Sequence, residues 1–104
     1  MSKQMYLEMP LKPEHAIDFA TLCNSKNGLA LSKQQPGFIS AEWMISMSED
    51  GNRCLHLWEK WQTIEHFEAY MRTSERSSSS DFQAAVQDWS AGKTRVFWGE
   101  ATIV

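Results

Sequence analysis

The sequence has few cysteines, no long hydrophobic run and no run of positive charge. Cys23 and Cys54 lie far apart and lack the Cys-x-x-Cys spacing of many zinc sites, so we expect two buried free thiols and no thiolate metal centre. No segment approaches the roughly 20 apolar residues of a membrane-spanning helix. The N-terminus lacks the charged and then apolar pattern of a signal peptide. We therefore expect a soluble, cytoplasmic protein without a membrane partner.

Basic residues are too few and too scattered for a nucleic-acid-binding surface. The chain has 10 Lys and Arg against 13 Asp and Glu, for a formal net charge of −3. Nucleic acid is therefore not an expected partner. No Ser-His-Asp arrangement, glycine-rich phosphate loop or metal-ligand cluster is recognisable. At 104 residues the chain fits one domain, over residues 1–104, with a core large enough to fold without metals or disulfides.

The segment 55–73, LHLWEKWQTIEHFEAYMRT, changes its hydrophobic period from 2 to 3.6. Apolar and polar residues alternate over 55–61 and then recur every three or four residues, which predicts a strand running into an amphipathic helix. The Thr63 hydroxyl is placed to cap that helix. Its buried stripe is predicted to comprise Phe67, Tyr70 and Met71.

The remaining pattern predicts three further strands and two further helices. The strands are expected over 5–11, 38–48 and 94–104, and the helices from Pro13 onward and over 82–89. In the second strand, Ile39, Ala41, Trp43, Ile45 and Met47 are expected to share one face. The polar run 74–80, SERSSSS, is expected to form a loop.

This order defines a fold class of α+β type. The elements read β-α-β-β-α-α-β, which predicts a ferredoxin-like sandwich with a four-stranded antiparallel sheet and the helices on one face. The last strand places Phe97 and Trp98 on opposite faces, so the second sheet face is expected to meet another subunit. We expect a homodimer, with Trp58, Trp98 and Met44 contributing to its interface or interior.

Three motifs resemble the antibiotic biosynthesis monooxygenase (ABM) domain family of the dimeric α+β barrel superfamily. They are the first strand followed by Lys12-Pro13-Glu14, the segment Gln35-Pro36-Gly37-Phe38, and Leu57-Trp58-Glu59-Lys60-Trp61 followed by residues 63–67. The resemblance spans nearly the whole chain and implies a dimeric α+β barrel. Some members of the family oxidise aromatic polyketides with O2 and no flavin, metal or haem. Others degrade haem, and others have no established reaction.

The resemblance carries over only in part to individual residues. Trp61 matches the tryptophan that lines the pocket between sheet and helices. The haem-degrading branch also uses an Asn on the first strand and a His before the last strand, but the first strand here has no Asn and Val86 stands near the His position. The quinone-forming branch has an Asn where this chain has Leu57. Haem is therefore disfavoured, and no cofactor is expected.

A cofactor-free oxygenase needs a dry aromatic pocket, a proton acceptor and polar groups that stabilise a substrate anion. The catalytic candidates are Trp61, Tyr70 and His66. The substrate-binding candidates are Trp61, Tyr70, Phe67, Trp43 and Glu59. Each also has a structural interpretation, since large aromatic residues dominate cores and a helical His is commonly solvated. His56 shares a strand face with Trp58, which favours an interface position over a pocket position.

Two functions remain open from the sequence. The first is a cofactor-independent monooxygenase acting on a small planar aromatic or quinol, with an enclosed cavity beside Trp61. The second is a non-catalytic dimeric small-molecule-binding or accessory protein of the same fold. It predicts that Met and Leu side chains fill that space, because Met packs readily into irregular gaps.

Overall fold

The computed structural model describes residues 2–25, 29–73, 80–100 and 102. Most of the predicted loop at 74–80 and the end of the predicted last strand lie outside these residues.

Strands and helices follow the predicted order. The elements are β1 (Lys3–Leu11), the 3-10 helix η1 (Pro13–His15), α1 (Ala16–Cys23), the 3-10 helix η2 (Leu29–Gln34), β2 (Phe38–Met47), β3 (Arg53–Trp61), α2 (Ile64–Met71), α4 (Ser80–Trp89) and β4 (Arg95–Glu100). Pro13 opens the first helical segment, where its missing N–H leaves no bond unmade.

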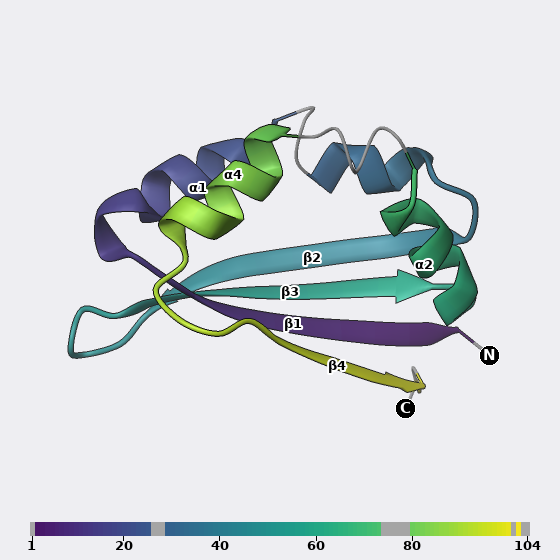
Figure 1. The fold of residues 1–104 in the computed structure, drawn as a ribbon. Coiled ribbons are helices and arrows are strands. Elements are labelled where there is room, and N and C mark those ends of the chain that lie inside the picture. The colour runs from purple at the N-terminus through teal and green to yellow at the C-terminus, as the bar shows by residue number, and fades with distance from the viewer. Residues whose placement is uncertain (1, 26–28, 74–79, 101, 103–104) are drawn as a thin grey trace.

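The strands form one antiparallel sheet in the order β2-β3-β1-β4. All described helices lie on one face of this sheet (Figure 1), with α1 and α4 over one end and α2 at the other. The predicted ferredoxin-like α+β fold is confirmed. The opposite face carries no described helix, so within the described residues one sheet face is covered and the other is open.

A bulge at the start of β2 changes the face of its first residues. Phe38 pairs with Trp61 and Ser40 with Lys60, so Ile39 is an extra residue opposite no partner. The prediction that Ile39 shares the face of Trp43 is therefore wrong, because one inserted residue reverses the alternation. Phe38 takes the covered face instead, and its ring meets the edge of Trp61 at 5.4 Å between centroids.

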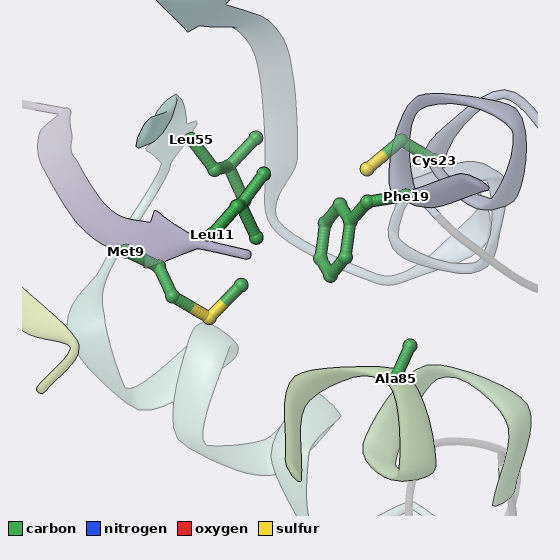
Figure 2. Packing of buried hydrophobic residues seen from close by; sticks show 6 residues of the cluster. All are labelled: Met9, Leu11, Phe19, Cys23, Leu55 and Ala85. Carbon is green, nitrogen blue, oxygen red and sulfur yellow. The ribbon is translucent and has the colours of Figure 1, made fainter. Parts of the chain in front are cut away.

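The main core lies between the sheet and the pair α1 and α4 (Figure 2). It comprises Met9, Leu11, Phe19, Cys23, Leu55 and Ala85, with Trp43 packed against it. Burial raises the pKa of the Cys23 thiol to about 12, so this thiol stays protonated at neutral pH. The cysteine is a packing residue here.

Truncating Phe19 tests this core. Phe19 is 0% exposed, so Phe19→Ala should lower the free energy of unfolding by about 3–5 kcal/mol. Ile17 on the same helix is 82% exposed, and Ile17→Ala should change it by less than about 0.5 kcal/mol. Urea unfolding measures both, and equal effects would contradict the described packing.

Candidate functional site

The candidate site forms where β3 runs into α2. Trp61, the last residue of β3, is 0% exposed. The chain turns at once into α2, because the Thr63 hydroxyl accepts the His66 backbone N–H at 3.1 Å and caps the helix as predicted. The turn folds α2 back over the end of the sheet, so side chains of helix and strand meet at Trp61.

Three aromatic rings contact Trp61. Phe38 and Phe67 approach it edge to face, and Tyr70 stacks on it, at centroid distances of 5.4, 5.6 and 5.7 Å. Trp98 of β4 extends the group, since its ring lies 5.2 Å from that of Phe67. These five residues, from three strands and one helix, are called the aromatic cluster below. Trp61 and Tyr70 are buried, and the other three members are half-buried.

Glu59 places a carboxylate beside the aromatic cluster. Its side chain lies on the covered face of β3, and the residue is only 4% exposed. The Trp61 indole Nε1 donates a hydrogen bond to Glu59 Oε1 at 3.1 Å. That bond fixes one carboxylate oxygen against the edge of the indole. An acidic group beside the Trp61 indole is thus largely shielded from water.

His66 lies at the border of the same region. Its Nδ1 is 2.7 Å from the Thr63 hydroxyl oxygen, and its ring packs over the backbone of Gly37. Gly37 precedes Phe38 in the chain and accepts the Gln62 backbone N–H at 2.7 Å. The imidazole is half-buried, and is therefore less solvated than an exposed helical histidine.

The structure brings together most of the predicted site residues. Tyr70, Phe67 and Glu59 each contact Trp61 directly, and His66 precedes Phe67 on α2. Trp43 does not join them. It pairs with Leu57, four residues before Trp61 and roughly 13 Å away along the strand, and packs on the main core.

Two residues of the cluster were not predicted for the site. Phe38 reaches it only through the bulge, which no sequence pattern announces. Trp98 was expected at the subunit interface or in the barrel interior, but it pairs with Met5, which is buried on the covered face, and its ring contacts Phe67. That expectation is wrong, because the register of β4 places Trp98 under the helices and Phe97 on the open face.

His56 lies on the other side of the sheet. Its Nδ1 is 2.7 Å from the Tyr6 hydroxyl, and its ring stacks with Trp58 at 6.1 Å between centroids. The predicted shared face of His56 and Trp58 is confirmed, so His56 is remote from Glu59. Among the described residues, no group of three His, Cys, Asp or Glu side chains could hold a metal ion.

Comparison with known proteins identifies the family. The family model "Antibiotic biosynthesis monooxygenase" (ABM) matches residues 5–88, and the chain therefore belongs to this family. No curated protein sequence matches the chain. Membership supports a monooxygenase-type function, with small molecules as the partners. Across the part of the chain that the structure describes, no helix is long and apolar enough to cross a membrane.

Solved structures share the fold at low sequence identity. Proteins from Nitrosomonas europaea and Caulobacter crescentus, whose names place them among antibiotic biosynthesis monooxygenases, are 18% and 15% identical with TM-scores of 0.71 and 0.76. Each alignment covers 96–98% of this chain and 89–91% of the other. SnoaB, a cofactor-independent oxygenase from Streptomyces nogalater, is 12% identical with a TM-score of 0.71, covering 99% of this chain and 95% of that one. At these identities the likeness establishes the fold alone.

A double-mutant cycle tests the bond between Trp61 and Glu59. A hydrogen bond to a charged group contributes about 1.5–3 kcal/mol to the free energy of unfolding. Trp61→Phe and Glu59→Leu each remove this bond, so the double variant should lose about 1.5–3 kcal/mol less than the two single variants lose in sum. Urea unfolding of the four proteins gives the coupling energy. In a control cycle, Trp89→Phe is combined with Glu59→Leu. Their effects on the free energy of unfolding should add, because Trp89 packs at the other end of the sheet. Additivity within about 0.5 kcal/mol for the Trp61 cycle would contradict the bond.

Proposed function

We propose that residues 1–104 form one ABM-type domain that acts as a cofactor-independent monooxygenase on a small planar aromatic or quinol. The substrate would bind between the sheet and α2, against Trp61, Phe67 and Tyr70. The observation that carries the proposal is the buried carboxylate of Glu59, held by the Trp61 indole within the aromatic cluster.

A buried carboxylate distinguishes a reactive site from ordinary packing. Removing a carboxylate from water costs free energy, which its hydrogen bond to Trp61 and its other contacts have to offset. A core that served stability alone would be better filled by an apolar side chain at position 59. Removal of a proton from a weakly acidic substrate requires a base. A buried carboxylate beside electron-rich rings would serve as that base.

The proposed chemistry divides between substrate, oxygen and protein. Glu59 accepts a proton from the substrate, and the resulting anion can donate an electron to O2. Oxidation of a ring CH2 to a carbonyl removes four electrons, which reduce O2. One oxygen atom enters the carbonyl, and the other leaves as water with the two hydrogens. The protein would contribute a stacking surface through Trp61 and a hydrogen bond from the Tyr70 hydroxyl to the anionic oxygen.

The second candidate is a non-catalytic member of the family that keeps the fold as a binding or accessory protein. The full burial of Trp61 favours it, because the three rings around the indole already satisfy its packing. Leu57 favours it as well, since the polar residue implied by the family resemblance is absent there and the leucine is buried.

Oxygen uptake decides between the two candidates. The purified protein should accelerate O2 consumption with members of a panel of anthrones, naphthols and quinols, in the presence of a chelator. Glu59→Gln keeps a hydrogen-bond acceptor for Trp61 and removes the base, so it should lower kcat by about 100-fold or more. Trp61→Phe and Tyr70→Phe should also reduce the rate.

The control for these variants is Trp89→Phe, which alters a tryptophan at the far end of the sheet and should leave the rate unchanged. If no compound is consumed above its spontaneous rate and none quenches tryptophan fluorescence, the monooxygenase proposal fails. Quenching without uptake would favour the second candidate.

We further propose that the open sheet face mediates homodimerisation. Aromatic rings occupy its centre, where Tyr6 lies 5.9 Å from Phe97 and 5.3 Å from Trp58 between centroids. Met44 of β2 and Phe97 of β4 lie on the two edge strands of the sheet and are 49% and 47% exposed, which leaves large apolar side chains in contact with water on this face. Burial against a second copy would remove this apolar surface from water.

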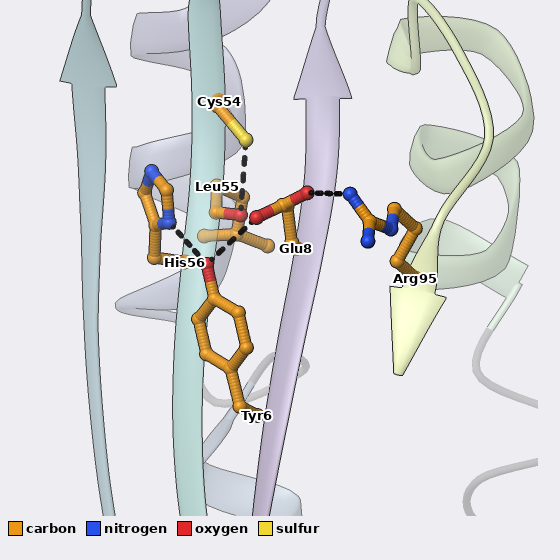
Figure 3. Close-up of polar contacts among 6 residues, drawn as sticks. All are labelled: Tyr6, Glu8, Cys54, Leu55, His56 and Arg95. Atoms are coloured by element: carbon orange, nitrogen blue, oxygen red, sulfur yellow. Dashed lines mark hydrogen bonds and ion pairs between the residues drawn. The ribbon is translucent and has the colours of Figure 1, made fainter. Parts of the chain in front are cut away.

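Four polar side chains on this face, those of Tyr6, Glu8, His56 and Arg95, are already paired with one another (Figure 3). Tyr6 donates to Glu8 Oε2 at 3.0 Å and bonds His56, and Arg95 donates to Glu8 Oε1 at 3.3 Å. Burial, and next the bond to Glu8, raise the pKa of Tyr6, so its hydroxyl remains a donor. The face can therefore enter an interface without leaving these groups unsatisfied.

Charge substitution tests the dimer. Met44→Lys or Phe97→Glu should convert a species of about twice the 12.0 kDa chain mass into a monomer, because the new charge would be buried in the interface. Light scattering after size exclusion measures this mass. Ile17→Lys, on α1 behind the sheet, should remain dimeric. A monomeric wild-type protein, or dimeric Met44 and Phe97 variants, would overturn the assignment.

A further inference from the structure

His66 makes two contacts with the residue that caps its helix. The Thr63 hydroxyl oxygen accepts the His66 backbone N–H at 3.1 Å and lies 2.7 Å from the His66 ring Nδ1. A hydroxyl carries one hydrogen to donate besides its lone pairs. If the oxygen accepts from the backbone, its hydrogen can point at Nδ1. In that arrangement Nδ1 is an acceptor, and the ring proton sits on Nε2.

Gly37 fixes the plane of the same ring. It has a φ of 85°, and a Cβ built on it would overlap the Cβ, Cγ and Cδ2 atoms of His66. The imidazole therefore occupies the space that any other residue at position 37 would take. Because the Gly37 carbonyl is bound by the Gln62 backbone N–H at 2.7 Å, this strand-leading loop cannot easily move away from α2.

We propose that Thr63 and Gly37 are positioning residues that hold His66 as a neutral hydrogen-bond donor, through Nε2, toward a phenolate-type oxygen of the substrate. The inference rests on the proposed function and assigns a role within it. His66 stabilises the anion, and Glu59 remains the proton acceptor.

The position of the ring supports this division of roles. His66 lies in the first turn of α2, three residues after the Thr63 cap. No described residue bonds Nε2, so that nitrogen is available to a ligand. A fixed donor is suited to stabilising charge that develops during a reaction, because it needs no reorientation.

Two substitutions of the cap separate hydrogen-bond polarity from helix stability. Serine and aspartate both cap helices well, so Thr63→Ser and Thr63→Asp should both retain α2. Serine keeps the hydroxyl hydrogen, whereas a carboxylate only accepts. Long-range ¹⁵N NMR at about pH 8, where an ordinary imidazole is neutral, reports which ring nitrogen is protonated. We expect the proton on Nε2 in wild type and Thr63→Ser, and on Nδ1 in Thr63→Asp.

Two glycines provide a matched pair for the packing contact. Gly37 and Gly51 have φ values of 85° and 84°, but a Cβ on Gly51 meets nothing within 4 Å. Gly37→Ala and Gly51→Ala therefore carry the same backbone penalty, and only the first displaces His66. The ring resonances of His66 should shift in Gly37→Ala and stay in place in Gly51→Ala.

NMR without substrate tests the positioning of His66, whereas oxygen uptake tests the proposed function. Either result can contradict its own proposal without contradicting the other. A proton on Nδ1 in the wild type, or no change of tautomer in Thr63→Asp, would overturn the positioning role whether or not the protein is an enzyme. With an active substrate, Thr63→Asp should lower kcat by about 100-fold with little effect on KM, and Thr63→Ser should restore it. The expected tautomers without any oxidation would leave the positioning intact and reject the proposed function.

Discussion

The hydrogen bond from the Trp61 indole to Glu59 is the interaction on which the candidate site depends. It joins two residues of one strand whose side chains point to the covered face, and it lies at the point where the sheet ends and α2 begins. The bond orients the indole, and three rings then pack around it. It also provides one of the contacts that stabilise a buried carboxylate. The same hydrogen bond therefore holds both the indole around which the rings pack and the carboxylate proposed as the base.

The two faces of the sheet separate two roles. On the covered face, the main core under α1 and α4 stabilises one end, and the aromatic cluster under α2 forms the candidate site at the other. On the open face, Tyr6, Glu8, His56 and Arg95 are paired with one another, and Phe97 and Met44 are exposed. Because neighbouring residues of a strand alternate between faces, a single strand serves both: β3 presents Glu59 and Trp61 to one side and His56 and Trp58 to the other.

Local patterns predicted the elements better than the positions within them. The change of period at 55–73 located β3 and α2, and the Thr63 cap was recognisable from residue type and place. Alternation gives the face of a residue but not its distance from another residue on that face, so Trp43 was grouped with Trp61 although it packs on the main core. Ile39 and Trp98 were misplaced for a related reason. A bulge and a strand register depend on pairing between distant segments, which no local pattern encodes.

The five tryptophans allow the central claim, that planar aromatics bind at the aromatic cluster, to be tested in one experiment. Each indole N–H gives a separate ¹H–¹⁵N resonance. Trp61 and Trp98 report on the cluster, Trp43 and Trp89 on the main core, and Trp58 on the open face. Titration with a naphthol should shift the Trp61 and Trp98 signals saturably and leave the other three unchanged. Shifts confined to Trp58, or to the main core, would place the ligand elsewhere and contradict the assignment of the site.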